Sequence, residues 1–81
     1  MSACDACETV IDVRQVPPRM RHTLVLTTFG QLGPGGAFRI VNDHDPRPLL
    51  YQFCNLHPGE FDWTYEESGP NVWKVRIGRA A

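Results

Sequence analysis

Apolar residues recur along the chain with two spacings, one typical of strands and the other of helices. Runs in which apolar and polar residues alternate, or in which β-branched residues gather, predict strands at 9–13, 37–41, 61–66 and 73–77. Apolar residues three or four positions apart predict helices at 18–32 and 46–57. The expected order is therefore strand, helix, strand, helix, strand, strand.

The segment 18–32 permits two interpretations. Val25, Phe29 and Leu32 fall at helical spacing, and the segment begins with a proline and is followed by a glycine. The run 23–28 is also rich in residues that favour strands, so a strand there is the alternative. The proline and the glycine favour the helix.

The second helix and the two strands after it each show one apolar face. The apolar stripe of the helix consists of Leu49, Leu50, Phe53, Cys54 and Leu56. The last two strands alternate apolar and polar residues, and the turn at 67–71 joins them into a hairpin. Their polar faces carry acids on one strand and bases on the other, which suits a solvent-facing antiparallel pair.

These elements fit a two-layer α/β sandwich. Two strands joined through a helix are expected to lie parallel, with a right-handed connection. The hairpin adds two antiparallel strands, which gives a mixed four-stranded sheet with both helices on its single apolar face. We expect one domain at 9–79 and a flexible N-terminal tail at 1–8, where no periodicity is found.

Composition and charge exclude several classes of function. A formal net charge of -1 gives no general basic field, so nucleic acid is not expected as a partner. No apolar run reaches the roughly 18 residues that span a bilayer, and no basic segment followed by an apolar one opens the chain. The three cysteines, an odd number, fit poorly with a fully paired secreted protein. We therefore expect a cytoplasmic protein without a membrane partner.

The segment 41–49 joins the end of a strand to the start of a helix and gathers the most useful side chains. Asp45 is expected to cap that helix with its carboxylate, and Pro46 suits the first helical position. The C-terminal ends of two parallel strands meet at one sheet edge, together with the N-termini of the helices that follow, and such N-termini attract anions. The residues expected to bind a ligand at this edge are Arg14, Arg21, His22, Asp43, His44, Asp45 and Arg47, with Arg19 nearby.

The two acids Asp43 and Asp45 could orient His44 or the arginines, but a purely structural interpretation is also open. Asp45 would then only cap the helix, His44 would bond the backbone of the corner, and the arginines would be solvated or paired with acids. His22 would be a surface residue. The two histidines with an aspartate could also bind a metal ion, although they come from separate elements. No serine or cysteine adjoins the histidines to indicate an activated nucleophile.

A second candidate site combines two pairs of residues with the same spacing. Cys4 and Cys7 are separated by two residues, as are Cys54 and His57, a spacing that suits zinc and, for the cysteine pair, redox exchange. Since the second helix runs back antiparallel to the first strand, its C-terminal end is expected near the entry of the tail. The structural alternative is two incidental thiols, with Cys54 in the core and His57 at the helix end.

Several short motifs together resemble a known family. They are Asp12-Val13-Arg14, Pro17-Pro18, Arg21-His22, the segment 41–49, Gly59-Glu60-Phe61-Asp62-Trp63, Gly69-Pro70 and Trp73. The pattern resembles a bacterial and archaeal family of uncharacterised domains with the fold of the sulfur carriers TusA and SirA, and it covers nearly all of 12–79. Carriers of the TusA type open their first helix with Cys-Pro, where this chain has Pro17-Pro18. Because proline has no sulfur, the resemblance implies the fold and not sulfur transfer at that position.

The leading expectation is a small non-catalytic binding or accessory module. It would engage an anionic small molecule or a partner protein at the edge where the helices begin. The first alternative is a sulfur or thiol-redox carrier that uses Cys4 and Cys7. The second is a metal-binding protein, with zinc as the candidate cofactor, that uses the cysteines or the histidines.

Overall fold

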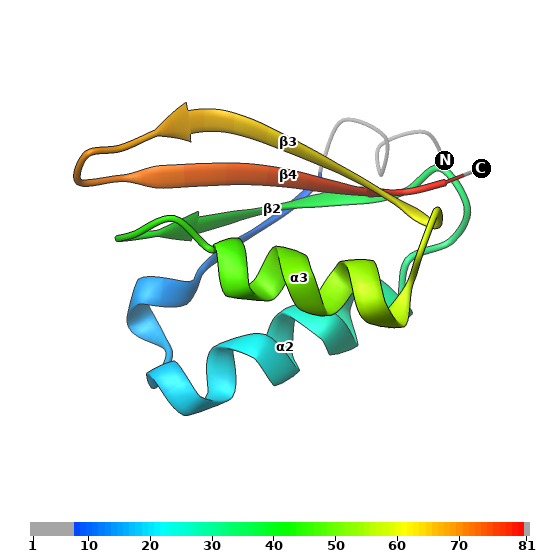
Figure 1. The fold of residues 1–81 in the computed structure, drawn as a ribbon, viewed down its shortest axis with the longest axis horizontal. Coiled ribbons are helices and arrows are strands. Elements are labelled where there is room, and N and C mark those ends of the chain that lie inside the picture. The colour runs from blue at the N-terminus through cyan, green and yellow to red at the C-terminus, as the bar shows by residue number, and fades with distance from the viewer. Residues whose placement is uncertain (1–7, 81) are drawn as a thin grey trace.

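The computed structural model describes residues 8–80, which form a four-stranded sheet with two helices on one face (Figure 1). In chain order, the elements are β1 (Thr9–Asp12), the 3-10 turn η1 (Val13–Gln15), α2 (Pro18–Gly30), β2 (Ala37–Asn42), α3 (Arg47–Leu56), β3 (Phe61–Ser68) and β4 (Trp73–Arg79). The expected two-layer α/β sandwich and its order of elements are confirmed, while η1 was not predicted. In this part of the chain, neither helix has the length and apolar character needed to cross a membrane.

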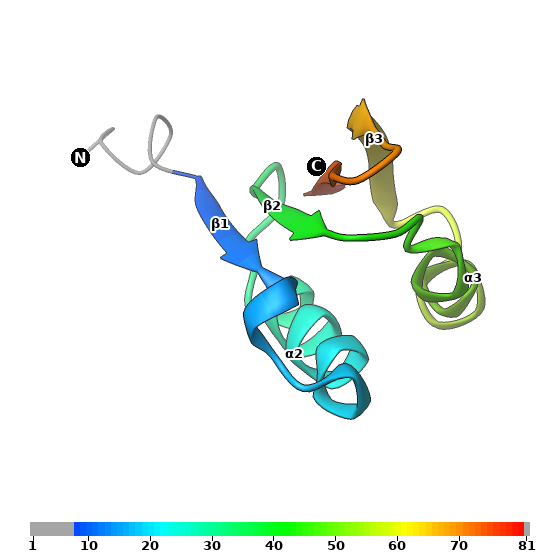
Figure 2. The same ribbon diagram turned by 90° about the vertical axis from the view of Figure 1, so that its left-hand side faces the viewer.

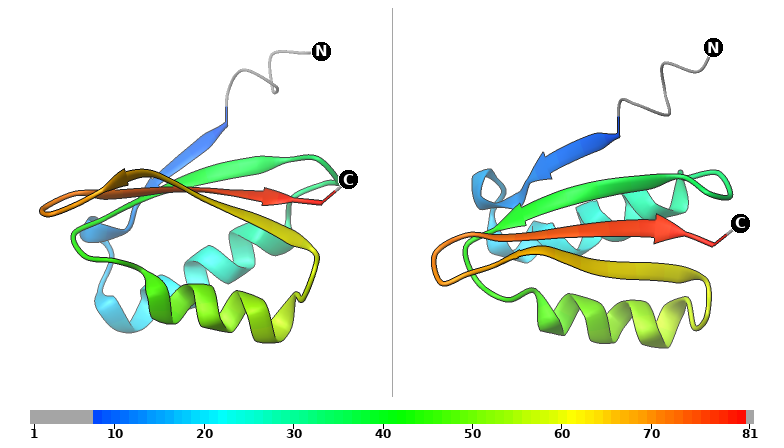
Figure 3. Two further views of the ribbon diagram at one scale, coloured as in Figure 1. Left: turned by 45° about the horizontal axis from the view of Figure 1, so that its top comes forward. Right: turned by 90° about the horizontal axis from the view of Figure 1, so that it is seen from above.

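The strands lie in the order β1-β2-β4-β3, so the sheet mixes parallel and antiparallel pairs (Figure 3). β1 and β2 are parallel, with Ile11 opposite Ile40, as expected for strands joined through a helix. β4 runs antiparallel to both β2 and β3, with a shift of register between Tyr65 and Glu67. β2 and β4 therefore form the centre of the sheet, and β1 and β3 form its two edges.

The core lies between the sheet and the two helices. Because side chains alternate along a strand, Phe38 and Ile40 of β2 share one face, and both are fully buried in the core. Phe29 of α2 and Phe53 of α3 meet with ring centroids 5.1 Å apart and planes at 87°, an edge-to-face contact. The other buried members of this cluster are Val13, Val25, Leu49, Val75 and Ile77.

α2 confirms the helical interpretation of 18–32 and excludes the strand alternative at 23–28. Val25 and Phe29 of the expected stripe are fully buried, and Leu32 packs against the core just beyond the end of the helix. The helix thus forms through burial of one apolar face, which outweighs the strand preference of its middle residues.

The apolar stripe of α3 is narrower than expected. Leu49 and Phe53 are buried, but Cys54 and Leu56 are exposed, so placing these two in the core was wrong. The ring of His57 lies 4.8 Å from that of Phe29 between centroids, and 6.0 Å from that of Phe53. His57 therefore packs against the core beside the last turn of α3, where Cys54 and Leu56 do not.

The outer face of the sheet carries a cluster of ion pairs. Glu8 accepts hydrogen bonds from both Arg39 of β2 and Arg76 of β4, and Arg39 also donates to Glu66 of β3. The expected pairing of acids on one hairpin strand with bases on the other is found at Glu67 and Lys74, 3.6 Å apart. Residues 1–7 lie outside the described residues, so the flexible tail stays a prediction.

Glu8 is expected to make the stability of the domain depend on pH. Hydrogen bonds from Arg76, with the charge of Arg39, hold the pKa of the Glu8 carboxyl below its ordinary value of 4.5. Since the folded-state pKa is depressed, the stabilisation is present above pH 4.5 and disappears as the pH falls through the lowered pKa. Glu8→Gln should therefore lower the unfolding temperature at about pH 7 but have little effect at about pH 2.5.

The matched control is Glu67→Gln, which breaks a more exposed pair with Lys74. Such pairs contribute about 0 to 1 kcal/mol, so this variant should unfold close to the wild type at both pH values. An equal effect of Glu8→Gln on the unfolding temperature at the two pH values would contradict the lowered pKa of Glu8.

Candidate functional site

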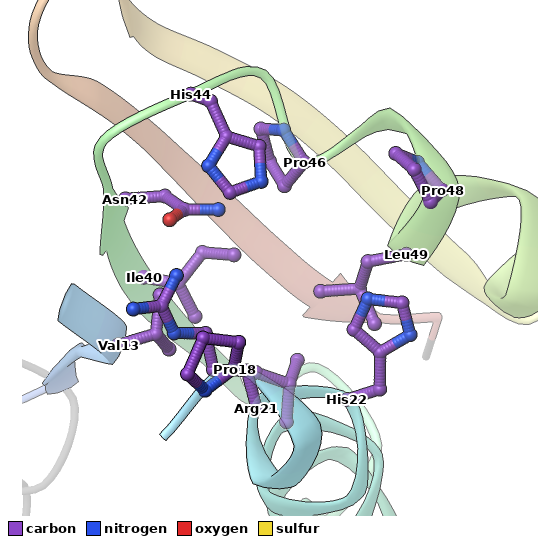
Figure 4. Close-up of a pocket in the computed structure, with 11 residues that line it drawn as sticks. Val13, Pro18, Arg21, His22, Ile40, Asn42, His44, Pro46, Pro48 and Leu49 are labelled. Carbon is purple, nitrogen blue, oxygen red and sulfur yellow. The ribbon is translucent and has the colours of Figure 1, made fainter. Parts of the chain in front are cut away.

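A pocket of about 190 Å³ lies where the N-termini of α2 and α3 meet the ends of β1 and β2. Figure 2 looks onto this edge of the molecule, with α2 and α3 on either side of the end of β2. Buried core residues, namely Val13, Val25, Ile40 and Leu49, form its apolar lining. Its polar lining consists of Arg21, His22, Asn42 and His44 (Figure 4). The expected meeting of the two helix starts at one sheet edge is confirmed.

Asn42 is the buried polar residue of the site, and the sequence interpretation missed it. It follows Phe38 and Ile40 on the inward face of β2 and is only 5% exposed. Its Oδ1 accepts the N–H of Asp43 at 2.9 Å, which leaves the amide nitrogen facing the pocket (Figure 4). No hydrogen bond from that nitrogen is found within residues 8–80, and because it opens onto the pocket, water or a ligand can accept from it. The signal available in the sequence was an asparagine at the end of a strand, in register with the two core residues before it.

Arg21 reaches the pocket from the first turns of α2. Its side chain is 14% exposed, its Nε donates to the carbonyl of Val16 at 2.8 Å, and Nη1 lies 3.9 Å from Oδ1 of Asp43. The backbone contact fixes the direction of the guanidinium. Because 3.9 Å exceeds hydrogen-bond length, the terminal nitrogens of Arg21 keep capacity to bind a ligand.

Both histidines of the pocket are oriented through Nδ1. Nδ1 of His44 lies 2.6 Å from Oδ1 of Asp43, and Nδ1 of His22 lies 3.1 Å from Oε1 of Gln52. Carboxylate and amide oxygens accept hydrogen bonds, so each Nδ1 is the donor, and a ring in its neutral form keeps an acceptor at Nε2. The hydrogen bond with His44, together with the charges of His44 and Arg21, lowers the pKa of Asp43. The expectation that an aspartate orients His44 is confirmed.

Asp45 does not cap α3, so that prediction was wrong. Pro46 occupies the N-cap position without a side-chain cap, and Oδ1 of Asp45 accepts the hydroxyl of Tyr65 at 2.7 Å. The reason lies in the spacing of the two prolines. With Pro46 as the cap, Pro48 falls at the second helical position and offers no N–H for a capping group. The carboxylate therefore turns towards β3.

Arg14 and Arg47 do not line the pocket, and each is paired with a nearby acid, as the purely structural interpretation expected. Arg14 donates to both carboxylate oxygens of Asp12 at 2.8 and 2.7 Å, and Arg47 donates to Asp45 at 3.2 Å. Arg19 is exposed on α2. Of the arginines predicted at this edge, the structure brings Arg21 to the pocket and pairs Arg14 and Arg47 with their own neighbours.

The chain matches the model of a family described as an uncharacterised conserved protein, DUF2249, over residues 10–79. It belongs to that family. The match runs from β1 to the end of β4, so it includes both helix starts and every side chain that lines the pocket. No curated protein and no solved structure matches the chain. The family description assigns no activity, so the role of the pocket rests on its side chains.

Only Cys54 and His57 of the second candidate site lie within the described residues, so the site stays a prediction. Cys54 is an exposed free cysteine, and Nδ1 of His57 lies 3.1 Å from Oε1 of Glu60. β1 forms one edge of the sheet, whereas α3 lies beneath the opposite edge, near β3 (Figure 2), so the two elements are not neighbours. Cys4 and Cys7 lie outside the described residues. Within 8–80, no group of three or more His, Cys, Asp or Glu side chains could hold a metal ion.

The contact between Tyr65 and Asp45 gives a direct test of the corner that precedes α3. Burial and the Asp45 carboxylate raise the pKa of the Tyr65 phenol above its ordinary value of 10.0. Asp45→Asn should lower that pKa, because a tyrosinate would no longer face a negative charge. The measurement is ultraviolet absorbance against pH in a Tyr51→Phe background, which leaves Tyr65 as the titrating tyrosine.

Asp43→Asn serves as the control in the same background. Asp43 contacts His44 and Arg21, not Tyr65, so this variant should leave the titration of Tyr65 where it is. Equal titration midpoints for the two variants would contradict the observed role of Asp45.

Proposed function

We propose that this domain is a non-catalytic, cytoplasmic binding module. In our proposal the pocket between α2 and α3 holds a small anion, or one anionic group of a partner protein. The observation that carries the proposal is the amide nitrogen of Asn42, a donor on a buried residue that opens onto the pocket and has no protein partner among residues 8–80. A bound anion would provide that partner in place of water, and a hydrogen bond to a charged acceptor contributes about 1.5 to 3 kcal/mol.

The surroundings of Asn42 favour an anion as that acceptor. Arg21 adds a guanidinium that is oriented by Val16 and mostly shielded from solvent. Neither α2 nor α3 has a side-chain cap or an acidic residue in its first turn. The positive ends of both helices therefore face the pocket without competition from their own side chains.

The charges around the pocket indicate recognition at short range. Asp12, Asp43 and Asp45 lie beside Arg14, Arg21 and Arg47, respectively, within 4 Å. These pairs balance most of the charge at the edge, so long-range attraction of anions is weak. Binding would depend on hydrogen bonds formed inside the pocket, where the apolar lining strengthens them.

The lining supports binding rather than nucleophilic catalysis. Among the described residues that line the pocket, none is a serine, threonine or cysteine. His44 is oriented by Asp43 as a base would be, but it has no such nucleophile beside it within this lining.

We also infer a relationship to the fold of TusA and SirA from the order of strands and helices. Pro17 stands at the N-cap of α2 and Pro18 at its first position, where the sulfur carriers have Cys-Pro. Sulfur relay through that helix start is therefore not part of our proposal.

The proposal is tested by replacing the donor at position 42. Asn42→Asp keeps an oxygen to accept the N–H of Asp43 but exchanges the donor for a negative oxygen, so binding of acetate should fall by about tenfold or more. The measurement is a titration with sodium acetate at constant ionic strength, followed by two-dimensional NMR. In the wild type, the side-chain amide signals of Asn42 and the Nε–H signal of Arg21 should shift and saturate.

Arg21→Gln and Arg19→Gln form a matched pair that does not alter Asn42. Arg21 lines the pocket, whereas Arg19 is exposed on the same helix and does not. Arg21→Gln should weaken acetate binding, and Arg19→Gln should leave it unchanged. Equal effects of the two variants, or acetate shifts confined to other surfaces, would contradict the proposal.

A further inference from the structure

The pocket offers acceptors as well as donors, and this combination restricts its ligand. Asn42 and Arg21 present N–H groups, whereas His44 and His22 in their neutral form present a lone pair at Nε2. A plain carboxylate would satisfy the donors and leave the imidazole acceptors to water. A ligand that matches the site therefore carries a hydroxyl donor beside its anionic group.

Size and apolar lining restrict the ligand further. A cavity of about 190 Å³ lies below the roughly 300 to 1,000 Å³ of sites for drug-sized molecules, so only a few heavy atoms fit. Ile40 and Leu49 form part of its apolar lining, and three prolines add further apolar surface. These walls favour a short alkyl group over an ion that is polar on all sides.

We propose that the ligand class of this pocket is a small 2-hydroxycarboxylate, an inference that rests on the proposed function. The carboxylate accepts from the Asn42 amide and the Arg21 guanidinium. The hydroxyl donates to Nε2 of His44, which lines the same pocket as Asn42 (Figure 4). The short alkyl group lies against Ile40 and Leu49. Asp43 acts as a positioning residue, because its hydrogen bond at Nδ1 keeps Nε2 of His44 an acceptor.

The test compares lactate with propionate, which differs from it by the hydroxyl alone. Both affinities are measured by calorimetric titration at about pH 8. Lactate should bind about threefold to tenfold more tightly than propionate, the range that one added hydrogen bond gives. Phosphate, a polar ion that also carries a hydroxyl, should bind more weakly than lactate.

The variant His44→Ala tests whether His44 accepts the hydroxyl of lactate. The side chain of His44 is 63% exposed, so its removal should leave the fold intact, as thermal unfolding would verify. In this variant the preference for lactate over propionate should vanish while propionate binding persists. Arg19→Ala, at an exposed position outside the lining, should keep the preference.

The outcomes separate this inference from the function on which it rests. Equal binding of lactate and propionate to the wild type would overturn the hydroxycarboxylate class and leave anion binding standing. A preference for lactate that survives His44→Ala would overturn the assigned acceptor. Tighter binding of phosphate than of lactate would overturn the hydroxycarboxylate class in favour of tetrahedral oxyanions. Absence of binding by all three anions would contradict the proposed function itself.

Discussion

The alternation of side chains along β2 is the constraint on which both the core and the pocket depend. Phe38, Ile40 and Asn42 occupy successive inward positions of this strand. The first two anchor the helices through the hydrophobic cluster, and the third continues the same row beyond it. Ile40 belongs at once to the core and to the pocket lining. The site is therefore held by the best-packed part of the molecule, and a shift of one residue in the register of β2 would remove both.

Prolines make the pocket rigid where the chain enters each helix. Pro17 and Pro18 open α2, and Pro46 and Pro48 flank the start of α3. Each fixes one backbone angle, so the walls lose little conformational freedom when a ligand arrives. The cost is that Pro18 and Pro48 offer no N–H at the helix starts. The side chains of Asn42 and Arg21 consequently supply much of the donor capacity that the backbone of such a site would otherwise provide.

Sequence periodicity was sufficient to predict the elements, their order and the edge at which the helices begin, because each depends on local spacing and on the handedness of one connection. The expected meeting of strand ends and helix starts also pointed to Arg21, His22 and His44, which line the pocket. Periodicity could not choose partners among the many acids and arginines near that edge. Asp45 accepts a hydrogen bond from Tyr65, which is twenty residues away on β3. Only tertiary distances therefore reveal that Asp45 does not cap α3. Asn42 was missed because an asparagine at a strand end ordinarily indicates a turn.

The near balance of charge at the edge explains how such a small pocket could be selective. Each arginine in a close pair with an aspartate keeps its charge at the rim, and the pocket itself receives directed donors and acceptors. A site dominated by net positive charge would accept any small anion, with discrimination only by size. A site with the donors of Asn42 and Arg21 opposite the acceptor of His44 instead favours a ligand that supplies both partners, because each further hydrogen bond adds to its affinity. The pattern of hydrogen-bonding groups, more than their total charge, is therefore what this fold holds in place.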